Sequence, residues 1–168
     1  MSEAELLLVN NADGCTIYTI QFLSESDSEF ERFYTRFKDD AEYNPDLMRI
    51  VALINKIADM GALERYFRPE GKLKDGVCAL PVLQSKLRLY CLRLSDKILV
   101  LGNGGIKKTR TYNEDCHEDM GTAGWLLEQF KYFLKACGYA NETVDKLIFL
   151  GYGEKVINAN GEVIYEYK

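Results

Sequence analysis

Short apolar segments separated by brief polar links predict three β-strands in the middle of the chain. These segments are residues 77–81, 86–94 and 97–101. Links this short favour antiparallel neighbours, so we expect a three-stranded meander with a tight turn at Ser95-Asp96. The glycine pair Gly104-Gly105 then predicts a bend at the end of the last strand.

The middle strand of this meander has two different sides. In an extended chain, Leu87, Leu89 and Cys91 point one way, whereas Arg88 and Tyr90 point the other way. We expect the apolar side to pack on two helices. The other side, with Arg88 and Tyr90, is then expected to be an open sheet face.

The N-terminal part predicts one strand followed by two helices. Residues 16–23 are rich in β-branched and aromatic side chains, which favours a strand. Aromatic residues recur at helical spacing between Phe30 and Phe37, which indicates a short amphipathic helix. Asn44-Pro45-Asp46 is typical of a helix start, and apolar positions from Leu47 onward predict a second helix that Gly61 ends.

Beyond Tyr112 the pattern predicts a separate set of elements. Thr122 is a candidate N-cap for a helix with a strongly apolar side, which Gly138 would end. Residues 146–150 predict a strand, and residues 155–167 predict a hairpin whose turn contains Asn160-Gly161.

These elements place the chain in the α+β class. We expect a core domain in residues 1–112, built from a small antiparallel-dominated sheet with both N-terminal helices on one face. Residues 113–168 are expected to form a C-terminal helix and β-hairpin extension packed on the same domain. Ten acidic and five basic residues make this extension acidic, so it is expected either to restrain a basic face or to complete the core.

Charge is distributed unevenly along the 168 residues. The chain has a net charge of −5, yet residues 65–112 contain eleven Lys and Arg against three acidic residues. An acidic protein that gathers positive charge on one hairpin is expected to bind an anion there.

Composition limits the class of protein. With 47% apolar and 28% charged residues the chain is typical of a globular domain. No apolar run approaches the ~20 residues of a membrane span, and acidic residues precede the short run at residues 6–9, so we expect no membrane association. Five cysteines without a CxxC pair indicate reduced thiols in a cytoplasmic protein, with no metal site and no cofactor.

Three motifs are weaker than they first look. The glycines before Lys107 do not have the spacing of a phosphate-binding P-loop. His117 is the sole histidine and lies beside acidic residues, which favours a solvated surface position over catalysis. The acidic clusters at residues 39–42 and 114–119 are expected on solvated faces rather than around a metal.

The cationic residues of the central hairpin are the strongest candidates for a site. They can bind phosphates and stabilise charge at a phosphorus centre, and a tyrosine among them can stack on a base or donate a proton. For any one of them, a solvated sheet edge remains the simpler explanation. The candidates are Lys72, Lys74, Arg88, Tyr90, Lys107, Lys108, Arg110 and Tyr112.

The order of elements and four short motifs resemble a known family. The motifs are LKDG at residues 73–76, KLRLY at 86–90, ILVL at 98–101 and IKKT at 106–109. Together they resemble the RelE/ParE toxin superfamily of bacterial toxin–antitoxin systems, and most of all its phage-derived Gp49-like (HigB-like) branch. The resemblance covers roughly residues 16–112.

This resemblance implies a toxin that cuts messenger RNA, commonly on the ribosome, and that a cognate antitoxin holds inactive. In such enzymes a ribose 2′-hydroxyl attacks the adjacent phosphate without a metal. Arg88 would then stabilise the phosphate, while Lys107 and Lys108 would bind the backbone or stabilise the transition state. Tyr112 would stack on a base or transfer a proton.

Other functions stay open at this point. The same fold is compatible with a non-catalytic binding module, such as a gyrase-directed toxin or a phage-derived regulator. A third possibility is an interaction protein whose basic hairpin contacts an acidic partner chain. Similar basic sheets serve catalytic and non-catalytic members of the family, so the sequence does not separate these functions.

Overall fold

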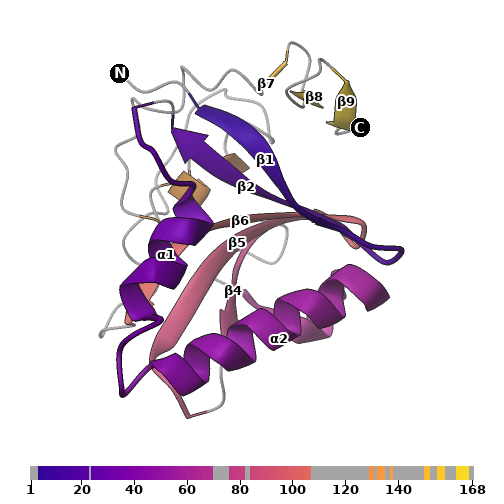
Figure 1. The fold of residues 1–168 in the computed structure, drawn as a ribbon. Helices are drawn as coiled ribbons and strands as arrows, with labels where there is room; N and C mark the ends of the chain where they lie inside the picture. The colour runs from indigo at the N-terminus through magenta and orange to yellow at the C-terminus, as the bar shows by residue number, and fades with distance from the viewer. Residues whose placement is uncertain are drawn as a thin grey trace.

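A computed structural model shows a mixed α+β fold with a mostly antiparallel sheet (Figure 1). The structure describes residues 4–22, 24–69, 76–81, 84–106, 129, 130, 132–134, 137, 150, 151, 155–157 and 162–166. Among these residues, six strands form the main sheet in the order β1-β2-β6-β5-β4-β3, and three form a small second sheet, β7-β8-β9. The strands of the main sheet are β1 (Ala4–Asn11), β2 (Thr16–Phe22), β3 (Arg68–Pro69), β4 (Val77–Pro81), β5 (Leu87–Ser95) and β6 (Ile98–Ile106).

Both predicted helices are present, and the first of them begins at a capping side chain, whereas the second has no side-chain cap. Helix α1 (Glu29–Phe37) starts at Ser28, whose hydroxyl accepts from Glu31 N while the Glu31 carboxylate accepts from Ser28 N, a complete capping box. Helix α2 (Asn44–Met60) has proline in its first turn, and Gly61 ends it with a φ of 105° that favours glycine. A short 3₁₀ turn, Glu64–Tyr66, follows.

The predicted three-stranded meander is confirmed, and the N-terminal strand β2 lies beside its last strand. Strands β4, β5 and β6 are antiparallel, and β2 pairs with β6 in parallel. The turn between β5 and β6 is at Asp96-Lys97, one residue later than predicted. Pro81 ends β4 opposite Arg88. Arg93 N donates to Gly76 O, so Gly76 and Arg93 are a hydrogen-bonded pair of this ladder. Because hydrogen-bonded and non-hydrogen-bonded pairs alternate, Pro81 and Arg88 form a non-hydrogen-bonded pair, where the missing N–H of proline costs no bond.

Strands β1 and β3 were not predicted. Strand β1 forms the edge of the sheet and pairs with β2 alone among the described strands, with an irregularity between Leu8 and Asn10. Its side chains Leu8 and Val9 are exposed. The predicted C-terminal hairpin is confirmed by the pairing of β8 (Lys155–Ile157) with β9 (Val163–Glu166), while its turn lies outside the described residues. Strand β7 (Leu150–Gly151) overlaps the end of the predicted strand at 146–150.

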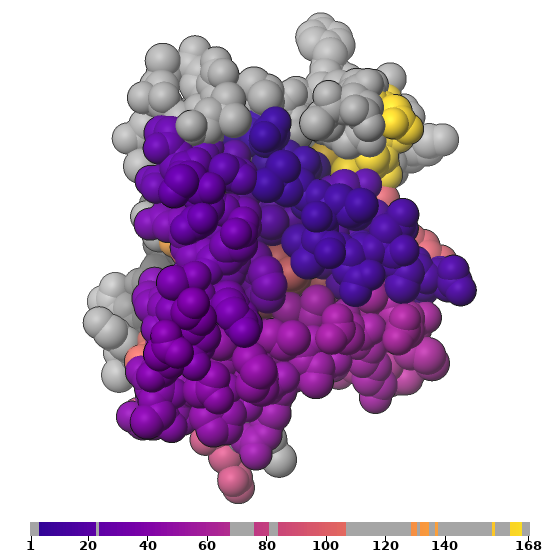
Figure 2. All heavy atoms as spheres, viewed as in Figure 1, coloured from indigo at the N-terminus to yellow at the C-terminus, as the bar shows by residue number. Residues whose placement is uncertain are grey.

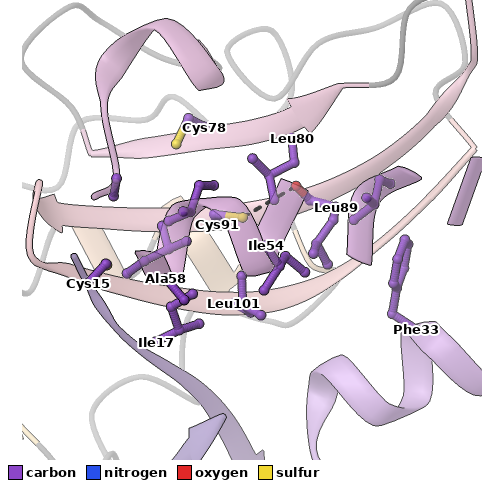
Figure 3. Close-up of a cluster of buried hydrophobic side chains, with 14 of the residues drawn as sticks. Cys15, Ile17, Phe33, Ile54, Ala58, Cys78, Leu80, Leu89, Cys91 and Leu101 are labelled. Atoms are coloured by element: carbon purple, nitrogen blue, oxygen red, sulfur yellow. Dashed lines mark hydrogen bonds between the residues drawn. The ribbon is translucent and has the colours of Figure 1, made fainter. Parts of the chain in front are cut away.

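One hydrophobic core lies between the sheet and the two helices, as predicted. Leu89 and Cys91 of β5 face Ile54 and Ala58 of α2, and Phe33 of α1 closes the side of this cluster (Figure 3). In the space-filling view α1 and α2 form a continuous surface over this face (Figure 2). The prediction that both helices cover one sheet face is therefore correct.

The opposite sheet face is not open, and this prediction is wrong. Leu92 and Leu94 of β5 and Val100 of β6 form a second core with Phe130 and Phe133 of the extension. The error arose because the side that carries Arg88 and Tyr90 continues through Leu92 and Leu94, which are apolar and require cover. The extension therefore completes the core.

Two polar contacts fasten the extension to the same sheet. Gly76 N donates to Gln129 Oε1 at 2.6 Å, and Asn103 N donates to Cys137 Sγ at 3.3 Å. Gln129 is fully buried. Residues 129, 130 and 132–134 are helical, in agreement with the predicted helix that begins near Thr122.

Four of the five cysteines belong to the described residues, and all four are free thiols. Cys15, Cys78, Cys91 and Cys137 are free, and the first three are buried. Burial raises the pKa of Cys15 to about 11, with Asp96 adding to the rise and a backbone hydrogen bond at Ala62 opposing it. Burial also raises the pKa of Cys91 well above its usual value. Both thiols are therefore protonated at neutral pH.

Within the described segments, none of the helices is long and apolar enough to span a membrane.

Candidate anion-binding end of the central hairpin

Strand β6 does not bend at its glycines, contrary to the prediction. It continues to Ile106 through a bulge in which Gly102 and Asn103 together oppose Tyr90 of β5. A Cβ atom on Gly104 would overlap the carbonyl oxygen of Arg88, and one on Gly102 would lie 2.7 Å from the Phe133 ring. The glycines therefore allow close backbone and ring approach at this end of the strand.

The bulge directs Asn103 toward α1, which lies beside the end of β6 (Figure 1). The Asn103 amide donates to Glu29 Oε1 at 3.4 Å, and its carbonyl oxygen accepts from Arg36 at 3.3 Å. Arg32 is ion-paired with the second oxygen of Glu29 at 3.2 Å. Glu29 is only 1% exposed and Asn103 only 8%, so these side chains form a buried polar link between helix and strand.

Arg36 is held in place by neutral acceptors. Its Nη2 donates both to Asn103 Oδ1 and to Gly104 O, and its guanidinium lies 4.9 Å from the centre of the Phe37 ring. Burial lowers the pKa of Arg36, Arg32 lowers it further, and Glu29 opposes the shift. Among the described residues, Arg36 forms no ion pair, so its charge is positioned but not directly neutralised.

Arg88 has a structural environment rather than the exposed one predicted for it. It is 7% exposed, and its Nη1 donates to Ser85 O at 2.6 Å and to Leu87 O at 2.9 Å. These bonds turn the guanidinium back onto the backbone at the start of β5. Arg88 is thus on the predicted sheet face, but that face is covered.

Of the remaining predicted site residues, Tyr90 alone belongs to the part of the chain that the structure describes. Tyr90 is half-buried on β5, opposite the bulge. The other six candidates lie outside the described residues: Lys72, Lys74, Lys107, Lys108, Arg110 and Tyr112. Strand β6 ends at Ile106, which is 42% exposed, so the chain reaches the surface directly before Lys107.

Four residues of this region were not predicted from the sequence. They are Glu29, Arg36, Lys86 and Asn103. The spacing of Glu29, Arg32 and Arg36 is a usable signal, because it places all three on one side of a helix. Asn103 was a second signal, because a polar side chain within an apolar strand requires partners. Lys86 is exposed and precedes the pair Leu87↔Ile106.

Within the described segments, no group of three or more His, Cys, Asp or Glu side chains could hold a metal ion. Comparison with known proteins gave no relative: no protein-family model, no curated protein and no solved structure matches this chain.

Proposed function

We propose that the chain is a toxin component of a type II toxin–antitoxin pair, of the RelE/ParE kind, and that it acts on messenger RNA. The observation that carries this proposal is the exposed end of β6, which leads directly into the sequence Lys107-Lys108. The order β2, α1, α2, β4, β5, β6 also agrees with the strand, two helices and meander on which the family resemblance rests. A cognate antitoxin and, for cleavage, the ribosome are the proposed partners.

Cleavage by this protein would require charge stabilisation and proton transfer from the residues that follow β6. In the proposed reaction the 2′-hydroxyl attacks the phosphate, and positive charge stabilises the oxygens of the transition state. Arg88 is 7% exposed and its Nη1 donates to the carbonyls of Ser85 and Leu87, so we propose a structural role for this residue. We therefore assign this role to Lys107 and Lys108, with Tyr112 for stacking or proton transfer.

A non-catalytic binding module is the second candidate, and the burial of Arg88 favours it. A module of this kind would keep the basic segment for binding, whether to RNA or to a target such as gyrase, and would not cut RNA. The two candidates differ in what happens to cellular messages, not in which residues bind.

Induced expression in a bacterial host tests the proposal, with growth and message integrity followed together. We expect the parent chain to arrest growth and shorten message lifetimes, and Lys107→Ala/Lys108→Ala to relieve both effects at equal protein level. Growth arrest with intact messages would select the non-catalytic module. Normal growth with intact messages, while the folded parent accumulates, would refute the toxin assignment.

A further inference from the structure

We infer that Arg36, with Lys86 at the same end of the sheet, forms a preorganised phosphate-binding position of the proposed RNA site. This inference rests on the proposed function and extends it from the chain after β6 to helix α1 and strand β5. The ligand class is the phosphate backbone of single-stranded RNA.

The guanidinium of Arg36 is fixed along one edge only. Nη2 bonds Asn103 Oδ1 and Gly104 O, and the Phe37 ring lies against the group. No other described residue bonds its Nη1 or Nε. Because Arg36 is an exposed residue, these donors can meet a phosphate without the guanidinium being reoriented.

The surroundings of Arg36 leave its charge available. Its acceptors are an amide and a carbonyl, whereas the nearby carboxylate of Glu29 is ion-paired with Arg32. A guanidinium that is partly desolvated and not ion-paired gains more from an added anion than one already paired with a carboxylate.

The neighbouring backbone gives space for a phosphate. Gly105 carries no side chain, and among the described residues a Cβ atom there would meet only Arg36 Nη2, at 3.5 Å. Lys86 is exposed one residue before the pair Leu87↔Ile106, and Lys107 follows Ile106 in sequence. Arg36 of α1 and Lys86, directly before β5, therefore both lie at this end of the sheet, which suits an extended polyanion better than a single small anion.

Arg36→Gln tests the inference by removing the charge while retaining an amide that can still donate a hydrogen bond. We expect it to weaken binding of a uniform single-stranded RNA oligonucleotide by roughly tenfold at ~0.1 M salt. The slope of log affinity against log salt should become shallower by about 0.7, the value for one phosphate contact on a single strand. Arg36→Lys should keep the parent's slope, since the charge remains.

Arg49→Gln is the matched control, because Arg49 is an exposed helical arginine on α2 paired with Asp46. It should leave both the affinity and the slope unchanged. A thermal melt of each variant separates binding from folding. Lys86→Ala provides a second test that does not disturb the Asn103 link, and should also lower the slope by about 0.7.

The outcomes separate this inference from the proposed function. If the parent binds RNA and Lys107→Ala/Lys108→Ala lowers the slope, but folded Arg36→Gln or Lys86→Ala keeps it, the Arg36 position is refuted and the function stands. If the parent binds no RNA, both are refuted. Equal loss of affinity in Arg36→Gln and Arg36→Lys with no change of slope would show that Arg36 acts only in the fold.

Discussion

Replacing Phe133 by alanine is expected to lower the free energy of unfolding by about 3–5 kcal/mol. Phe133 is fully buried, its ring centre lies 6.3 Å from that of Phe130, and it packs directly on Gly102 of β6. Its removal leaves a cavity between the extension and the sheet that the glycine strand cannot fill. Denaturant unfolding should show a lower midpoint with an unchanged slope. Met60→Ala, at a 60% exposed position, should stay within about 0.5 kcal/mol of the parent.

Truncation after Tyr112 extends the same prediction to the whole extension. Without Phe130 and Phe133, the apolar side chains Leu92 and Val100 would lose part of their cover. We expect the truncated chain to aggregate. A soluble, cooperatively folding fragment that binds RNA more tightly would show instead that the extension is a removable restraint on the basic face.

Replacing Arg88 by alanine is expected to cost about 2–4 kcal/mol of stability, because charge-assisted hydrogen bonds to buried carbonyls are lost. The carbonyls of Ser85 and Leu87 lose this donor at the start of β5. Lys86→Ala is the matched control: it removes a neighbouring charge that is exposed, and its unfolding midpoint should match the parent's.

The same variant separates a structural Arg88 from a catalytic one. Well below its melting temperature, Arg88→Ala should keep the parent's RNA affinity and whatever cleavage the parent has. A fully folded variant of unchanged stability that has lost cleavage alone would mean that Arg88 meets the substrate.

The sequence predicted the elements whose pattern and boundary signals agree. Helix α2 has a proline at its start, a regular apolar stripe and a glycine at its end, and it lies where expected. Strand β1 lacks such a signal. Its residues 6–9 are all apolar and show no alternation, although Leu8 and Val9 are exposed beside an irregularity of the edge strand. The parallel pairing of β2 with β6 joins residues about 80 positions apart, which no local pattern encodes.

The sequence predicted the positive charge of the candidate site but not the arrangement of its side chains. The excess of cations on the central hairpin is visible in the sequence, yet the sequence did not show which of them would be exposed. Arg88 is buried, and it shares its side of β5 with Leu92 and Leu94, which pack against the extension. The Asn103 link was hidden because its partner Glu29 is 74 positions away.

The salt dependence of RNA binding tests the central claim most directly, namely that the basic segment after β6 binds RNA phosphates. The full chain should bind a single-stranded RNA oligonucleotide, and Lys107→Ala/Lys108→Ala should make the slope of log affinity against log salt shallower by about 1.4, or ~0.7 per contact. Lys56→Ala/Lys97→Ala removes two lysines from other parts of the molecule and should leave the slope unchanged. Absence of binding by the parent at ~0.1 M salt, or the same slope for the parent and the Lys107/Lys108 variant, would contradict the account.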